Sequence, residues 1–218
     1  MNARTRFVSF AVLGVWLAAP APAGAHRLDE YLQATRLSID MERVGLEIDL
    51  TAGVGVASEV VAWIDANRDG QISSAEGERY ARLMLDSLLL SVDGRPAPIR
   101  LDDIRFPHVH DMSLGVGTIR VRASARVPAA GAGRHRLSYF NTHHPESSVY
   151  LVNALVPADR RIQITAQRRD HAQHGLELDY DVMVDASWAR TCSLLLAFAM
   201  GGVLVAARRP LAGGGTRM

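Results

Sequence analysis

One stretch of twelve residues has the residue types and the spacing needed to bind a hard cation. It runs from Asp65 to Glu76 and reads DANRDGQISSAE. Oxygen-bearing side chains stand at alternate positions in its first half, a glycine is sixth and a glutamate is last. Ca²⁺ takes about six to eight oxygen ligands at about 2.3–2.6 Å, so a short loop must wrap around it. The pattern therefore predicts a calcium site.

Every ligand position of this loop holds a suitable residue. We expect the ligands to be the side-chain oxygens of Asp65, Asn67 and Asp69, the carbonyl of Gln71, Ser73 through a water, and both oxygens of Glu76. Gly70 permits a positive-φ turn that a Cβ would resist. Ile72 would face away from the ion, towards a core or a partner loop. Ser73 and Glu76 have the spacing of a capping box, so they would also begin the following helix.

Both flanks of the loop predict helices, so that 54–88 forms a helix–loop–helix. Apolar residues fall on one helical face on each side, namely Val56, Val60, Val61 and Ile64, then Tyr80, Leu83, Met84 and Leu88. Loop and flanks together resemble the EF-hand family. EF-hands usually occur in pairs, and the chain shows one such loop. The resemblance therefore implies weak binding, at about 10⁻⁴–10⁻³ M, as in extracellular modules. The alternative is an acidic turn that matches by chance.

Histidines offer a second kind of metal site. The eight are His26, His108, His110, His135, His143, His144, His171 and His174. His108 with His110 and His171 with His174 have ligand-like spacing, and His26 would add a free amine after signal cleavage. Such groups suit Cu²⁺ or Ni²⁺. The alternative function is thus an accessory role in nickel, cobalt or copper handling, although ordinary loop histidines explain the spacing more simply.

No other residues have the pattern of a catalytic site. Ser147 and Ser148 lack the context of a nucleophile elbow. Asp102 and Asp103 are typical of a solvated turn, and the chain has no phosphate-binding glycine loop. We therefore predict a protein that is not an enzyme.

Most of the chain predicts short strands. Alternation of apolar and polar residues marks 31–40, 44–51, 88–92, 98–101, 118–127, 134–140, 149–156, 161–167 and 176–182. Turn residues separate them, as Asp93 and Gly94 do. The fold class predicted is mainly β: an antiparallel β-sandwich with the helix–loop–helix inserted at 54–88.

Both ends of the chain suggest export to a membrane. Residues 1–25 have a positive start, an apolar run and a small-residue ending, as in a signal peptide. Residues 191–207 carry no charge and lie between Arg190 and Arg208. We expect a transmembrane anchor at 188–209 and a cytoplasmic tail at 210–218. The alternatives are an uncleaved N-terminal anchor and a buried C-terminal helix.

The middle region, 26–187, is then a periplasmic or extracellular domain of the usual size for one domain. It holds 18 arginines and all 23 acidic residues, which gives a formal charge of −5. An acidic domain disfavours nucleic acid as a partner. The one cysteine, Cys192, excludes an intrachain disulfide.

Two further segments, AHRLDEYLQA at 25–34 and VYLVNALVP at 149–157, are similar to periplasmic segments associated with the HupE/UreJ family of nickel and cobalt permease-like proteins. The resemblance implies a sandwich-like exterior domain linked to metal handling, with a multi-span metal permease as a partner. Transport by this chain alone is not implied, because a permease needs several spans and one is predicted here.

Overall fold

The structure, a computed structural model, describes residues 29–183, and two five-stranded β-sheets make up most of this region. The predicted signal peptide at 1–25, anchor at 188–209 and tail at 210–218 lie outside the described residues. Between residues 29 and 183, no helix combines the length and the apolar character needed to cross a membrane.

The first sheet has the strand order β5-β6-β2-β1-β8. Its strands are β1 (Tyr31–Ile39), β2 (Arg43–Ala52), β5 (Ile99–Arg105), β6 (Thr118–Arg126) and β8 (Ser148–Ala154). The second sheet has the order β4-β3-β7-β10-β9. Its strands are β3 (Leu88–Val92), β4 (Arg95–Pro96), β7 (Gly133–Asn141), β9 (Ile162–Arg169) and β10 (Gly175–Val182).

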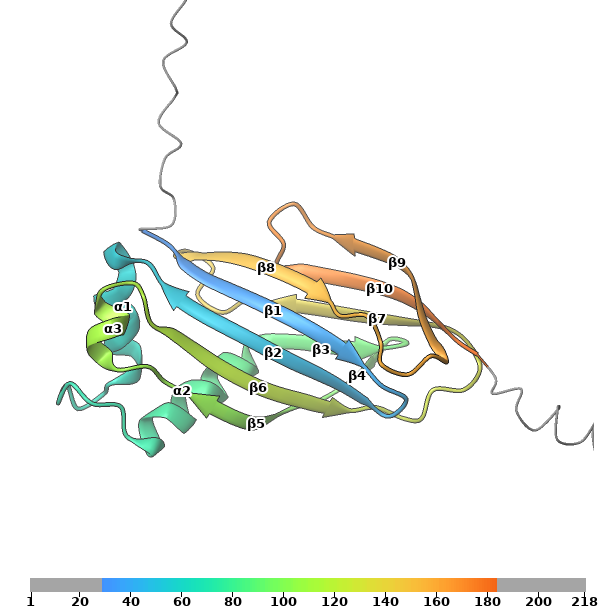
Figure 1. Cartoon of the computed structure of the whole chain (residues 1–218), viewed down its shortest axis with the longest axis horizontal. Coiled ribbons are helices and arrows are strands. Elements are labelled where there is room, and N and C mark those ends of the chain that lie inside the picture. The colour runs from blue at the N-terminus through green and yellow to red at the C-terminus, as the bar shows by residue number, and fades with distance from the viewer. Residues whose placement is uncertain (1–28, 184–218) are drawn as a thin grey trace, which may run out of the picture.

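The two sheets lie face to face with the core between them (Figure 1). Along β1 every second residue is buried, as expected for a strand with one face on a core. The hydroxyls of Thr35 on β1 and Tyr139 on β7 share a hydrogen bond of 3.1 Å across this core. The prediction of a mainly β fold with two mostly antiparallel sheets is confirmed.

One strand pair differs from the antiparallel prediction. β8 runs parallel to β1, with Tyr31 opposite Ser148 and Leu37 opposite Ala154. The reason is that the chain changes sheets between β7 and β8, so β8 begins at the same end of the molecule as β1. There the Tyr31 N–H donates to the Ser147 carbonyl at 2.7 Å.

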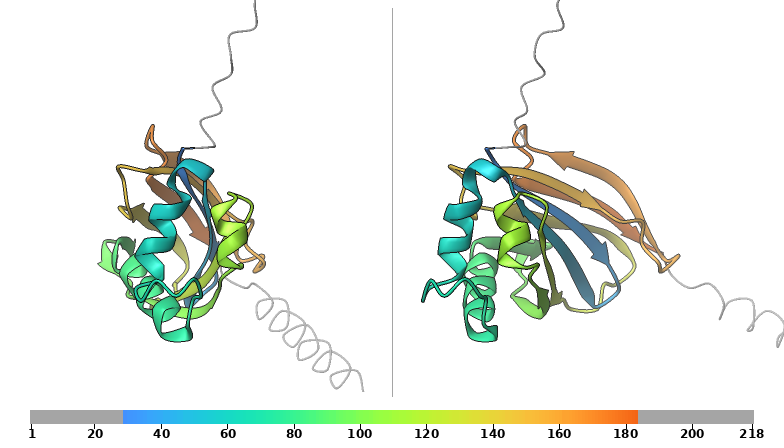
Figure 2. Two further views of the ribbon diagram at one scale, coloured as in Figure 1. Left: turned by 90° about the vertical axis from the view of Figure 1, so that its left-hand side faces the viewer. Right: turned by 60° about the vertical axis from the view of Figure 1, so that its left-hand side comes forward.

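Three helices gather at one end of the two sheets (Figure 2). They are α1 (Val54–Ile64), α2 (Ser74–Asp86) and the short α3 (Val109–Ser113). The first two lie between β2 and β3 in the chain and form the helix–loop–helix expected at 54–88. Helix α3 and the two-residue strand β4 were not expected from the sequence. Their shortness leaves too little periodicity to detect.

Candidate metal centre

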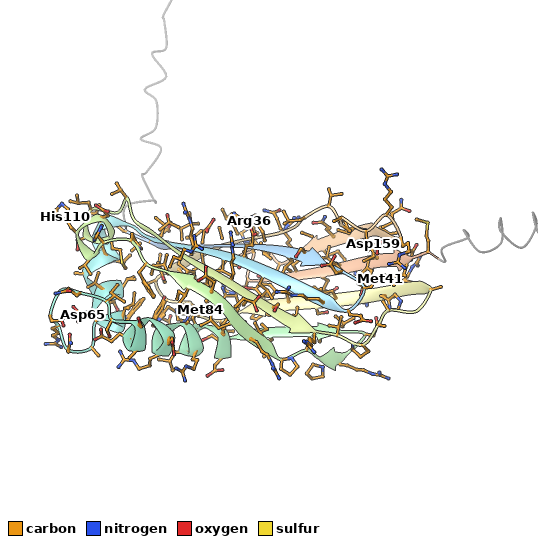
Figure 3. The ribbon with its side chains drawn as sticks, turned by 60° about the horizontal axis from the view of Figure 1, so that its bottom comes forward. Arg36, Met41, Asp65, Met84, His110 and Asp159 are labelled. Carbon is orange, nitrogen blue, oxygen red and sulfur yellow. The ribbon has the colours of Figure 1, made fainter. Side chains whose placement is uncertain are left out.

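The loop between α1 and α2 is held by the two helices that it joins. Asp65 follows α1 directly and donates its N–H to the Val61 carbonyl at 2.8 Å. Ser73 is the N-cap of α2, and Glu76 lies in the first turn. Asp65 and Glu76 are buried, whereas 66–71 are exposed. Figure 3 shows Asp65 at one tip of the molecule.

Backbone groups of the loop point at the carboxylates of Asp65 and Asp69. Asp65 Oδ1 accepts from the Asp69 N–H at 3.2 Å, and Oδ2 accepts from the Gly70 N–H at 2.9 Å. Asp69 accepts from Asn67 Nδ2 at 2.9 Å and from the Gln71 N–H at 2.8 Å. Gly70 has a φ of +77°, which glycine adopts without a steric penalty. The turn therefore takes the positive-φ conformation that the sequence predicts.

Glu76 closes the loop by bonding to both of its ends. Its Oε1 accepts from the N–H groups of Ala66 at 2.9 Å and Asn67 at 3.3 Å. Its Oε2 accepts from the Ser73 N–H at 3.0 Å and the Ser73 hydroxyl at 2.7 Å. The Ser73 hydroxyl and the surrounding N–H groups lower the pKa of Glu76 to about 2. The carboxylate is therefore ionised at neutral pH.

The predicted capping box is present. The Ser73 hydroxyl accepts from the Glu76 N–H at 3.3 Å, and the Glu76 side chain bonds back to the Ser73 N–H. This reciprocal pair satisfies two N–H groups that a helix start would otherwise leave free. The residue predicted to close a cation site thus also sets the first turn of α2.

These residues fit a hard cation in type and aim. All six carboxylate oxygens of Asp65, Asp69 and Glu76 accept hydrogen bonds from within the loop. Each carboxylate oxygen has about two lone pairs, so the oxygens of Asp65 and Asp69 each keep one for a ligand, whereas each oxygen of Glu76 already accepts two hydrogen bonds. Across residues 29–183, however, no three His, Cys, Asp or Glu side chains are grouped closely enough to hold a metal ion. Binding would require the carboxylates to draw together.

The loop and α2 are backed by Phe106, which follows β5. Gly77 lies so close to the Phe106 ring that a Cβ added there would meet Cε2 at 2.6 Å. The Phe106 ring also makes an edge contact with Tyr80, with centroids 6.3 Å apart. Ile72 is partly buried and packs against the hydrophobic core, so of the two directions expected for it the structure shows the core.

A chain of buried polar groups lies behind α2. The hydroxyls of Tyr31 and Tyr80 are hydrogen-bonded at 2.5 Å, and the Tyr80 hydroxyl reaches His143 Nε2 at 3.1 Å. Burial raises the pKa of both tyrosines. Burial, with the neighbouring His144, lowers the pKa of His143 to about 3. His143 is therefore neutral at physiological pH.

The segment that carries His143 is fixed from several sides. Gln33 Nε2 donates to the His143 carbonyl at 2.7 Å, and the Tyr150 hydroxyl donates to it at 2.8 Å. The next residue, His144, has a φ of +48° and stacks on the Trp63 ring of α1 at 3.5 Å. Burial lowers the pKa of His144 as well. Helix α2 therefore contacts His143 through Tyr80, and helix α1 contacts the next residue, His144, through Trp63.

The histidine pairs singled out by spacing are placed in ordinary surroundings. His108 is the N-cap of α3, His110 lies within α3, and both are exposed. His171 is exposed in the turn after β9, and the His174 ring packs edge-on against Tyr150 at 4.3 Å. His26 lies outside the described residues. The pairing of His143 and His144 with α2 and α1 was not predicted. Their adjacency was the only signal in the sequence.

Comparison with known proteins adds no family assignment. No family model matches the chain, and neither a curated protein nor a solved structure shows significant similarity to it.

Proposed function

We propose that this chain is a calcium-binding protein with a single EF-hand, in which the ion has a structural or sensing role. The observation that carries the proposal is the inward aim of the loop carboxylates. Three ionisable side chains, those of Asp65, Asp69 and Glu76, have every oxygen directed at loop N–H groups. A hard divalent cation favours such oxygen ligands, and it would offset the repulsion between neighbouring carboxylates.

The contacts of the loop suggest what the ion would do. Glu76 begins α2, and the next residue, Gly77, abuts Phe106. Asp65 ends α1, whose Trp63 stacks on His144. An ion drawing Asp65 and Glu76 together would therefore tighten both helices onto the sheets. Because the ion would bind only the folded state, its binding would raise the free energy of unfolding.

We further propose that the domain is extracytoplasmic and is held at the membrane by residues 188–209. The support is the uncharged run at 191–207 between arginines, together with the signal-like residues 1–25. Catalysis is not part of the proposal. A multi-span metal permease is the partner implied by the HupE/UreJ resemblance.

Calorimetry on the purified chain tests the calcium site. Titration should give saturable heat with Ca²⁺ at millimolar concentration, as expected for a weak single hand at about 10⁻⁴–10⁻³ M. The double variant Asp65→Asn/Glu76→Gln should lose this heat. The matched control Glu78→Gln/Asp86→Asn makes the same charge change at exposed positions of α2 and should keep it.

Two outcomes would contradict the proposal. One is the absence of Ca²⁺ heat in the native chain. The other is equal heat from the native chain and the Asp65→Asn/Glu76→Gln variant. Heat with Ni²⁺ or Cu²⁺ but none with Ca²⁺ would favour the histidine alternative.

A further inference from the structure

The chain leaves the second sheet beside the connection between β8 and β9. The Met183 N–H, just after β10, donates to the Arg161 carbonyl of this connection at 2.8 Å. Asp159, in the same connection, lies at one end of the molecule (Figure 3). Asp65 lies at the opposite end. The candidate calcium loop and the exit of the chain are therefore at opposite ends of the domain.

Apolar side chains are exposed around this exit. Val156 is 91% exposed, Met183 is 49% exposed and Leu155 is 38% exposed. A hollow of about 300 Å³ continues from Leu155 and Val156 to Ile162 and Ile164 on β9. Leu155 and Val156 are the exposed apolar side chains of this hollow, Ile164 is half-buried and Ile162 is buried; together with Met183, whose N–H bonds to Arg161, we call them the exit patch. Apolar surface grouped in this way marks an interaction site more often than single exposed residues do.

At this end of the domain, the charged residues near the exit patch differ from those of the neighbouring turn between β1 and β2. Asp159 is paired with Arg161 at 2.6 Å, so its charge is offset. Arg160 is exposed, and no ion pair of the described residues includes it. In the turn between β1 and β2, by contrast, Asp40 and Glu42 are exposed acids. A basic side chain beside apolar ones suits an anionic lipid surface, while the acidic turn suits water.

Covalent reach limits how far this end can lie from the predicted anchor. Seven residues, 184–190, separate Met183 from the uncharged run that begins at Thr191. Seven residues span at most about 25 Å even when fully extended. If 191–207 crosses a bilayer, Met183 therefore lies no more than about 25 Å from its surface, which keeps the exit patch within reach of the headgroups.

From these observations we propose that the exit patch rests on the lipid surface, with Val156 as its deepest side chain and Arg160 at the headgroups. This inference depends on the membrane anchoring proposed above. It orients the domain with the exit patch against the bilayer and the loop at 65–76 directed away from it. The calcium loop would then face soluble ions and partners.

Lipid-borne quenching of a fluorophore tests the contact in the full chain. The chain is reconstituted in vesicles of phosphatidylcholine and phosphatidylglycerol with brominated acyl chains, in a Cys192→Ala background. An environment-sensitive dye is attached at Val156→Cys. The matched control is Val116→Cys, a valine that is 71% exposed in the segment after α3. We expect quenching several-fold stronger at position 156 than at 116. Vesicle flotation is measured for each sample.

Each outcome separates the inference from the function on which it rests. Selective quenching at position 156 supports the contact. Flotation of the chain with equal, weak quenching at both positions overturns the contact and leaves the anchor standing. A dye at position 156 that is protected from an aqueous quencher and is also not quenched by the brominated lipid would mean that a protein partner covers it, and would overturn the contact. Failure to float would overturn the anchor and the contact together.

Discussion

The ring of Phe106 lies against the backbone of Gly77, so close that a methyl group there would fall 2.6 Å from Cε2. Gly77 directly follows Glu76, the residue that closes the candidate calcium loop. The contact joins the first turn of α2 to the segment after β5. The size of the residue at position 77 therefore determines how closely the loop and the first turn of α2 can pack against the segment after β5.

Replacing Gly77 by alanine should destabilise the domain although alanine is the better helix former. The helix gain of about 1 kcal/mol is opposed by crowding against Phe106, which costs about 1–3 kcal/mol. In a Phe106→Leu background the crowding is relieved, so Gly77→Ala should become neutral or stabilising. Denaturant unfolding of the four chains measures this coupling. A Gly77→Ala cost that is the same in both backgrounds would refute the contact as its cause.

Removing the Tyr80 hydroxyl should cost more than removing that of Tyr31. Tyr80 lies between Tyr31 and His143 Nε2, so Tyr80→Phe leaves two buried groups without a partner. Tyr31→Phe leaves Tyr80 bonded to His143. An unpaired buried polar group costs about 1–3 kcal/mol, so the difference should be of this order. Thermal and denaturant unfolding give the values, and a larger loss for Tyr31→Phe would contradict the prediction.

Acid should destabilise the domain through His143. Unfolded histidine has a pKa of about 6.5, whereas folded His143 has a pKa of about 3. Between these values the unfolded state binds more protons, so the free energy of unfolding rises with pH. The contribution of His143 to the free energy of unfolding is fully present above about pH 6.5. It falls by about 2–3 kcal/mol when the pH is lowered to about 4.5.

A pair of histidine variants separates this effect from other titrations. His143→Gln should flatten the pH profile in that window. His135 is the control of opposite sign, because its hydrogen bond with Asp93 raises its pKa. Its contribution is present below about pH 6.5 and is lost as pH rises through the higher folded pKa. Parallel profiles for the native chain and His143→Gln would be evidence against the buried neutral imidazole.

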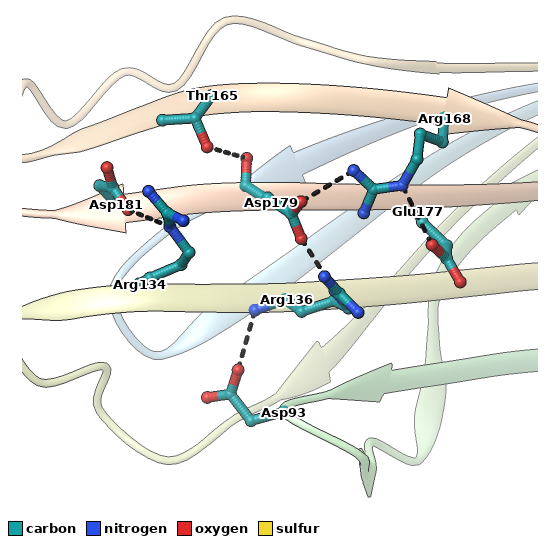
Figure 4. A network of polar contacts seen from close by, with 8 residues as sticks. All are labelled: Asp93, Arg134, Arg136, Thr165, Arg168, Glu177, Asp179 and Asp181. Atoms are coloured by element: carbon teal, nitrogen blue, oxygen red, sulfur yellow. Dashed lines mark hydrogen bonds and ion pairs between the residues drawn. The ribbon is translucent and has the colours of Figure 1, made fainter.

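Asp179 should stabilise the second sheet in a salt-dependent way. Its carboxylate joins Arg136 on β7 to Arg168 on β9, both at 2.8 Å (Figure 4). These guanidinium groups, Arg168 first, hold the pKa of Asp179 well below its usual range. The stabilisation is therefore present above the ordinary aspartate pKa and is lost as pH falls towards the lowered value.

Asp179→Asn should therefore lower the unfolding midpoint more in low salt than in high salt, since salt screens exposed charges. Asp181→Asn is the matched control, because Asp181 pairs with Arg134 alone, at 3.3 Å. We expect a smaller change there. Equal changes for both variants would show that bridging across three strands adds nothing.

Short-range patterns in the sequence were sufficient for much of the fold. Alternation placed 88–92 on the same residues as β3, and it located the other long strands to within a few residues. The spacing of Ser73 and Glu76 predicted the capping box that is present. These features depend on residues only two to four positions apart, so the chain specifies them locally.

Contacts between distant residues were decided by the tertiary structure. Tyr80 bonds to Tyr31, 49 positions away, and to His143, 63 positions away. The parallel pairing of β1 with β8 arises where the chain changes sheets, and strand patterning does not encode direction. The oxygen-bearing side chains at alternate positions of 65–76 can thus be recognised from the sequence alone. The contact of Gly77 with Phe106 and the burial of His143 arise only because packing brings remote segments of the chain together.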